Sequence, residues 1–193
     1  MILNACFEVI IIKSFGGYDL EKLEFVGRGM HGNVYRIDSI RCLKIFKKKT
    51  PWKNELRTLK MGQNDKHFPE LFSWGEGYII REFIDGIELD KYLLDNPLDF
   101  SMSKKVMELY DAMIKVGFSR CDTALLHIFV TKNRDLKLID TARAMKGSRR
   151  YPEMIIRDFK RLGCLETFFH HLSVIRPELY DEWNKKLKNR SQV

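Results

Sequence analysis

Residues 27–44 decide the fold of this chain, and they read Gly-Arg-Gly-Met-His-Gly-Asn-Val-Tyr-Arg-Ile-Asp-Ser-Ile-Arg-Cys-Leu-Lys. The stretch begins with Gly27, Gly29 and Gly32, which have the spacing G-x-G-x-x-G. Because glycine has no side chain, backbone N–H groups in such a loop can approach a polyphosphate closely. The spacing alone does not identify the fold, since dinucleotide-binding folds use it too.

The residues after the glycines distinguish the two possibilities. A dinucleotide-binding turn leads into a helix, whereas residues 34–38 and 42–46 have the composition of strands. Ser39–Arg41 is then the short turn of a β-hairpin. Lys44 lies inside the second of these strands, twelve residues after Gly32. A glycine loop between two strands, followed by a lysine in the next strand, predicts a site for nucleotide phosphates.

Beyond this hairpin the pattern changes from strands to helices. Pro51 fits the first turn of a helix over residues 52–61, which Gly62 ends. Other strands are expected at 23–26, 78–84, 128–130 and 136–139, and other helices at 89–94, 103–116, 153–173 and 177–187. This order indicates an α+β fold, with a β-rich part, a linker near residues 83–88 and an α-rich part. The apolar run at 8–12 is read as an extra strand or as residues that precede the native start.

Two aspartates in the α-rich part form a second signal. Asp122 and Asp140 lie eighteen residues apart, with the two short strands at 128–130 and 136–139 between them. Phosphoryl transfer depends mostly on positioning and charge neutralisation. It needs one carboxylate to orient the acceptor hydroxyl and another to hold Mg²⁺ against the phosphates.

The glycine loop, Lys44 and the two aspartates together resemble the protein-kinase-like fold over roughly residues 18–171. The chain looks most like a shortened form of the small stand-alone serine/threonine kinases of bacteria. The resemblance implies a two-lobed α+β fold with an antiparallel β-rich N-lobe over 18–84 and a shortened α-rich C-lobe over 85–193. Residues 1–17 are then an N-terminal extension.

The resemblance also implies a role for each site residue. Lys44 grips the ATP phosphates, Glu55 orients Lys44, Asp122 positions the acceptor hydroxyl, and Asp140 holds Mg²⁺, with Mn²⁺ as the alternative ion. The remaining nucleotide contacts are Gly27, Gly29, Gly32 and Val34 around the phosphates, and Glu82 and Ile84 in the hinge segment that receives adenine. His31 is expected over the phosphates, and Asp158 is expected to brace the catalytic loop. Each position also has an ordinary structural explanation, such as an exposed lysine or a turn cap.

Three departures from the family pattern keep other functions open. The usual His-Arg-Asp reads Arg120-Cys121-Asp122, and the triplet at the metal reads Asp140-Thr141-Ala142. His127 stands where the family has an asparagine that binds a second metal. Since Mg²⁺ prefers oxygen ligands, His127 leaves a single metal site, favours Mn²⁺ or packs in the core. The alternatives to a protein kinase are therefore a pseudokinase, which binds nucleotide without catalysis, and a small-molecule kinase.

Composition limits the partners and the compartment. The chain has 193 residues and a formal net charge of +8, which favours an anionic partner such as a nucleotide. A nucleic-acid-binding domain explains this charge but not the glycine loop. No window is apolar enough for a membrane span, and the first residues lack the pattern of a signal peptide. The four cysteines are scattered without a C-x-x-C pair, so we expect reduced thiols and a cytoplasmic protein.

Overall fold

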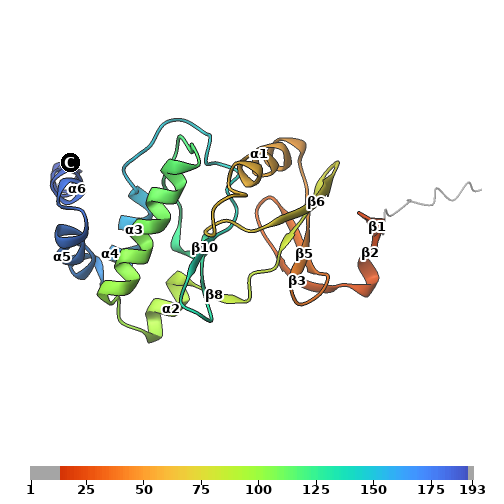
Figure 1. Ribbon diagram of the computed structural model, residues 1–193, viewed down its shortest axis with the longest axis horizontal. Helices are drawn as coiled ribbons and strands as arrows, with labels where there is room; N and C mark the ends of the chain where they lie inside the picture. The colour runs from red at the N-terminus through yellow and green to blue at the C-terminus, as the bar shows by residue number, and fades with distance from the viewer. Residues whose placement is uncertain (1–13, 191–193) are drawn as a thin grey trace, which may run out of the picture.

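A five-stranded antiparallel sheet forms one end of the molecule in the computed structural model, which describes residues 14–190 (Figure 1). Its strand order is β3-β4-β5-β7-β6, with bounds β3 Glu24–Arg28, β4 Gly32–Arg36, β5 Arg41–Phe46, β6 Leu71–Gly75 and β7 Tyr78–Glu82. A two-stranded hairpin, β1 Ser14–Phe15 and β2 Tyr18–Asp19, and a short 3₁₀ helix, η1 Leu20–Lys22, precede it. The extra strand expected at 8–12 lies outside the described residues.

The predicted hairpin is present as β4 and β5, and Asp38 stabilises its turn. The Asp38 carboxylate accepts hydrogen bonds from the backbone N–H groups of Ile40 and Arg41, at 2.9 and 2.8 Å. Both strands begin earlier than expected, and β4 starts at Gly32 itself. A Cβ at Gly32 would lie 1.9 Å from the carbonyl oxygen of Ile45 on the paired strand. This glycine is therefore required by the sheet as well as by the loop.

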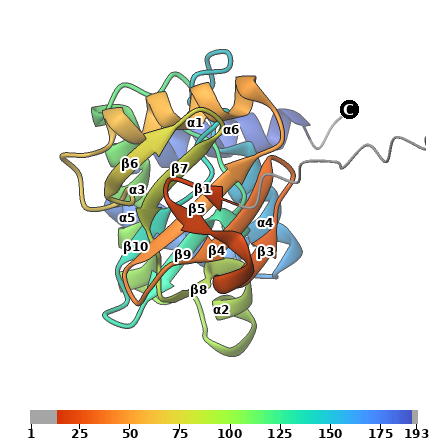
Figure 2. The ribbon, with the colours of Figure 1, turned by 90° about the vertical axis from the view of Figure 1, so that its right-hand side faces the viewer.

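The helix α1, Lys49–Met61, packs on the sheet (Figure 2). It begins three residues before the predicted start, so that Pro51 stands in its first turn. Trp52, Leu56 and Leu59 recur at helical spacing, and they pack with Phe46 and Ile79 of the sheet. The helix ends at Gly62, as predicted, with the Gly62 N–H donating to backbone carbonyls of the last turn.

The other end of the molecule is helical. Its helices are α2 Leu89–Asp95, α3 Phe100–Lys115, α4 Glu153–Arg161, α5 Leu165–Ile175 and α6 Pro177–Arg190. They enclose a large apolar core that includes Trp183, Phe118, Phe159 and Phe168. Between this core and the five-stranded sheet lie η2 Leu125–His127 and a three-stranded antiparallel sheet of β8 Gly86–Glu88, β9 Ile128–Thr131 and β10 Leu136–Leu138.

The α+β class is therefore confirmed, with local differences from expectation. Strands β1, β2, β6 and β8 were not predicted. The pairs β1–β2 and β6–β7 are local hairpins, whereas β8 has three residues and is defined by its pairing with the distant strand β9. The helical region expected over 153–173 is present as two helices, α4 and α5, which are separated at Gly163, where φ is 73°. Cys42, Cys121 and Cys164 are free thiols, while Cys6 lies outside the described residues. No helix within residues 14–190 is long and apolar enough to cross a membrane.

Candidate active site

Lys44 and Glu55 form a buried ion pair, as the resemblance to kinases implied. The Lys44 Nζ lies 2.6 Å from Oε2 and 2.8 Å from Oε1 of Glu55. The residues are 6% and 2% exposed, respectively. Strand β5 supplies the lysine and α1 the glutamate, so the packing of α1 on the sheet creates the pair. The same Nζ lies 3.8 Å from Oδ1 of Asp140.

A cavity of about 340 Å³ opens in front of this ion pair. Its walls include Gly27, Gly29, Gly32, Val34, Lys44, Ile84, His127 and Asp140. Eight of the predicted site residues therefore line one space, although they come from both ends of the molecule. A Cβ at Gly27 would meet no atom within 4 Å, so the loop borders open space at that position.

Glu82 does not line this cavity, in contrast to its predicted place in the hinge. Its carboxylate accepts a hydrogen bond from Lys137 Nζ at 2.6 Å. Its backbone N–H donates to the carbonyl oxygen of Glu70 at 2.8 Å. The neighbours that line the cavity are Arg81, Phe83 and Ile84. Arg81 was not among the site residues predicted from the sequence. The available signal was an arginine within an otherwise apolar strand.

Asp140 lies at the centre of a group of cationic and polar side chains. It adopts a φ of 55°, in the left-handed region that Asp and Asn tolerate better than other side chains. Burial alone would raise the pKa of the Asp140 carboxyl, but nearby positive charge, foremost that of Lys44, holds it below its ordinary value. Asp140 is therefore ionised at neutral pH, as an oxygen ligand for a cation requires.

His127 lies beside Asp140, as predicted, and its ring is mostly buried. Burial lowers the pKa of His127, against the opposing charge of Asp140, so the imidazole is neutral at pH 7. Among residues 14–190, no three or more His, Cys, Asp or Glu side chains are arranged to hold a metal ion. A Mg²⁺ ion commonly binds one or two carboxylates together with substrate phosphates and water. The residues present fit that arrangement with Asp140 as the carboxylate ligand.

A second cavity, of about 450 Å³, adjoins the first at Asp140. Five residues line both: Gly29, His31, Leu126, His127 and Asp140. Lys44 lines only the first cavity, and Asp122 lines only the second. The two predicted catalytic carboxylates thus lie along one continuous space, one at the junction of the cavities and one beyond it.

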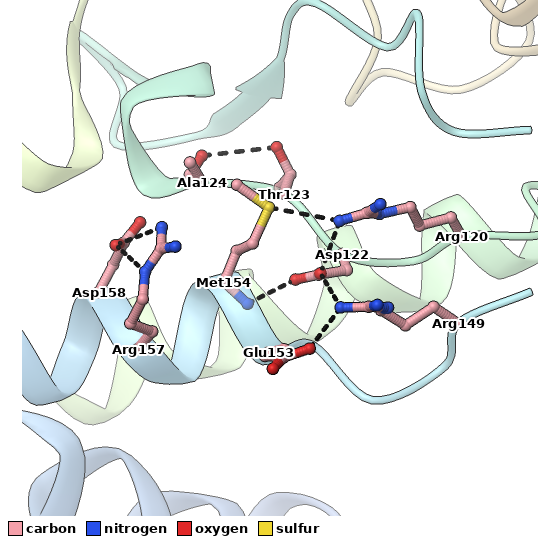
Figure 3. Close-up of polar contacts among 9 residues, drawn as sticks. All are labelled: Arg120, Asp122, Thr123, Ala124, Arg149, Glu153, Met154, Arg157 and Asp158. Carbon is pink, nitrogen blue, oxygen red and sulfur yellow. Dashed lines mark hydrogen bonds and ion pairs between the residues drawn. The ribbon is translucent and has the colours of Figure 1, made fainter. Parts of the chain in front are cut away.

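Two hydrogen bonds and a longer ion pair hold the Asp122 carboxylate (Figure 3). Oδ1 accepts from the backbone N–H of Met154 at 2.7 Å, at the start of α4. Oδ2 lies 3.2 Å from Arg120 Nη2 and 3.8 Å from Arg149 Nη1. Burial raises the pKa of Asp122, and the Met154 N–H and Arg120 oppose that shift. Arg149 also pairs with Glu153, so its guanidinium is shared between Glu153 and Asp122.

The segment after Asp140 is fastened to the residues just before Asp122. The N–H of Arg120 donates to the Ala144 carbonyl at 2.9 Å, and the N–H of Cys121 donates to the Arg149 carbonyl at 2.8 Å. On the opposite side, Asp158 Oδ2 accepts from the backbone N–H of Leu125 at 3.1 Å. The expected brace between Asp158 and the chain beyond Asp122 is therefore present.

Comparison with known proteins assigns no family to this chain. No protein-family model matches it, and no curated protein is significantly similar to it. The function has to be inferred from the chemistry of the two cavities and of the four charged residues that line or support them, Lys44, Glu55, Asp122 and Asp140.

Proposed function

We propose that this protein is a phosphotransferase with a protein-kinase-like two-lobed fold, which moves the γ-phosphate of ATP to a hydroxyl group. One observation carries the proposal: two cavities meet at Asp140, with the Lys44–Glu55 pair behind the first and Asp122 in the wall of the second. Such an arrangement keeps a phosphate donor and a hydroxyl acceptor on opposite sides of one carboxylate.

The donor side suits a polyphosphate. Lys44 is a compact positive charge, and Glu55 holds its ammonium in place through two hydrogen bonds. His31 lies in the wall shared by the two cavities and adds a polar group from the glycine loop. Bound Mg²⁺ would neutralise charge on the β- and γ-phosphates, and Asp140 is the residue that would hold it.

The acceptor side suits a hydroxyl, since Asp122 can accept its proton or orient it. The proposed acceptor is a serine or threonine side chain of a protein. A small-molecule hydroxyl is the second candidate, since the α-rich part over residues 85–193 has only about a hundred residues and offers limited surface for docking a peptide.

A pseudokinase is the rival from another class, because the Asp122 carboxylate is fully buried, already accepts two hydrogen bonds and pairs with Arg149. In that case the protein binds nucleotide and regulates a partner without chemistry. Catalysis requires that an acceptor hydroxyl replaces one of these three partners, and Arg149, at 3.8 Å, is the most weakly held of them.

The proposal is tested by phosphate transfer from radiolabelled ATP with Mg²⁺ or Mn²⁺, comparing the wild type with Asp140→Asn. Asparagine tolerates the left-handed backbone of this position, so the variant removes the charge without straining the turn. Autophosphorylation, or transfer to a generic protein or small hydroxyl compound, should be lost in the variant. Nucleotide binding without transfer to any acceptor supports the pseudokinase, and absence of nucleotide binding overturns both functions.

A further inference from the structure

Arg81 is a buried cation in the wall of the nucleotide cavity. It lies on β7 between Ile80 and Glu82, and the residue is 6% exposed. Its neighbours in the cavity wall are Cys42 of β5 and the Phe83–Ile84 segment, at the end of the cavity away from Asp122. A fully charged side chain is rare in such a place unless it is paired.

The hydrogen bonds of Arg81 are incomplete. Its Nη1 donates to the backbone carbonyl of Glu82 at 2.8 Å. Its Nε is buried and has no hydrogen-bond partner. Its charge acts on the buried Glu55 carboxylate, both oxygens of which accept from Lys44, but no carboxylate within residues 14–190 forms an ion pair with Arg81. A buried donor without an acceptor carries a free-energy cost. The buried Nε is closed to a ligand as well as to water, so a ligand acceptor would meet the guanidinium only through the part of Arg81 that lines the cavity.

The Glu82 carbonyl next to Arg81 is already engaged. It accepts from Arg81 and from the Cys42 thiol, at 2.8 and 3.6 Å. The N–H groups of Glu82 and Phe83 donate to the carbonyls of Glu70 and Ile40. In the described part of the chain, no hydrogen bond engages the N–H of Ile84 or the carbonyls of Phe83 and Ile84. The side chain that a base meets at this end of the cavity is the guanidinium of Arg81, which has only donors.

The two purine bases differ in what they offer to such donors. Guanine presents two adjacent acceptors, N7 and O6, whereas adenine presents N7 beside an amino group that is itself a donor. A guanidinium has five N–H donors and no acceptor, and its two-pronged geometry matches N7 and O6 of guanine. An adenine amino group directed at Arg81 would leave two donors facing each other.

We infer that Arg81 reads the base, and that this cavity selects nucleotides of 6-oxopurines, of which GTP is the common one, ahead of ATP. The inference rests on the proposed function, since it requires that the first cavity binds a nucleotide. It changes the identity of the favoured phosphate donor and leaves the roles of Lys44, Asp122 and Asp140 unchanged.

The test is equilibrium binding of GDP, IDP and ADP to the full chain with Mg²⁺, by calorimetry. IDP has the N7 and O6 acceptors of guanine but lacks its 2-amino group, so it isolates the contact assigned to Arg81. GDP and IDP should each bind about tenfold more tightly than ADP, as a good bidentate contact allows. Tighter binding of ADP, or binding of IDP as weak as that of ADP, overturns the inference and leaves the proposed function standing.

Arg81→Met should reduce the GDP-to-ADP ratio to about one or below, because it keeps the length of the side chain and removes every donor. Arg81→Lys keeps the charge without the two-pronged donor geometry of the guanidinium, so it should also lose the preference for GDP over ADP.

Arg36→Met is the matched control, since Arg36 stacks on Phe83 outside the cavity, and it should keep the wild-type ratio. An unchanged ratio in Arg81→Met overturns the inference. If Arg81→Met does not fold, the affinities of the wild type for GDP, IDP and ADP decide whether the inference holds. If none of the three nucleotides binds, the proposed function is overturned as well.

Discussion

Lys44 and Glu55 make a two-pronged ion pair, with the ammonium 2.6 and 2.8 Å from the carboxylate oxygens, in a place that water scarcely reaches. The pair joins α1 to the central strand of the five-stranded sheet. Its position therefore matters for folding as well as for a phosphate ligand, and the two effects can be separated by measuring stability and binding on the same variants.

Lys44→Met should abolish phosphate transfer and lower the free energy of unfolding by about 3 kcal/mol, because it leaves Glu55 buried without its partner. The double variant Lys44→Met/Glu55→Gln should recover part of this stability while transfer stays absent. Urea unfolding followed by circular dichroism measures the first quantity, and radiolabelled transfer measures the second. Wild-type stability in Lys44→Met would mean that the pair contributes nothing to the fold.

Asp122→Asn should reduce transfer by a factor on the order of 100 or more, as the loss of a group that positions or deprotonates a hydroxyl does. Nucleotide affinity should be unchanged, because Asp122 lines only the second cavity. Asparagine retains an oxygen that can accept from the Met154 N–H, so the start of α4 stays capped. Transfer at the wild-type rate would exclude Asp122 from the chemistry.

The hairpin and the glycine loop could be predicted because each depends on residues close together along the chain. The Lys44–Glu55 contact was expected from the resemblance to protein kinases. The same resemblance singled out Asp122 and Asp140, which line cavities that adjoin each other. The hinge was predicted less well. Glu82 and Arg81 alternate on one strand, and which of them faces the cavity depends on the pairing of β5 with β7.

Other features could not be predicted because they arise from contacts between distant segments. Strand β8 has three residues and is defined by its pairing with β9. The three partners of the Asp122 carboxylate come from both sides of it along the chain, and Met154 contributes only its backbone N–H. No side-chain pattern encodes such a contact, so the buried state of Asp122 is a result of the structure alone.

His127→Asn should retain or raise transfer supported by Mg²⁺, since it replaces a neutral imidazole with an amide oxygen that Mg²⁺ accepts more readily. The ratio of Mg²⁺-supported to Mn²⁺-supported activity should rise in the same variant. Initial rates over a series of metal concentrations measure both effects. A complete loss of activity with either ion, in a folded variant, would show that the imidazole has a role of its own.

Asp99 provides a test of the fold far from the cavities. Its carboxylate accepts from the Met102 N–H at 2.7 Å at the start of α3, and it pairs with Arg134 at 2.6 Å. The hydrogen bond from Arg134 is the main cause that holds the pKa of Asp99 below its ordinary value. Since the folded-state pKa is lowered, the ionised group stabilises the fold above the unfolded-state pKa of about 3.9. This contribution is lost as the pH falls through the lower folded-state pKa.

Asp99→Asn keeps an acceptor for the Met102 N–H but cannot ionise, so it should be less stable than the wild type at pH 7 by a margin that shrinks below about pH 4. Asp99→Ala also loses the helix cap, and it should be about 1 kcal/mol less stable than Asp99→Asn at every pH. Urea unfolding at a series of pH values between neutral and acidic measures both differences. The difference in free energy of unfolding between wild type and Asp99→Asn should therefore change with pH. If it stayed constant from neutral to acidic pH, the result would contradict the lowered pKa, because a group with an unshifted pKa adds no pH dependence to stability.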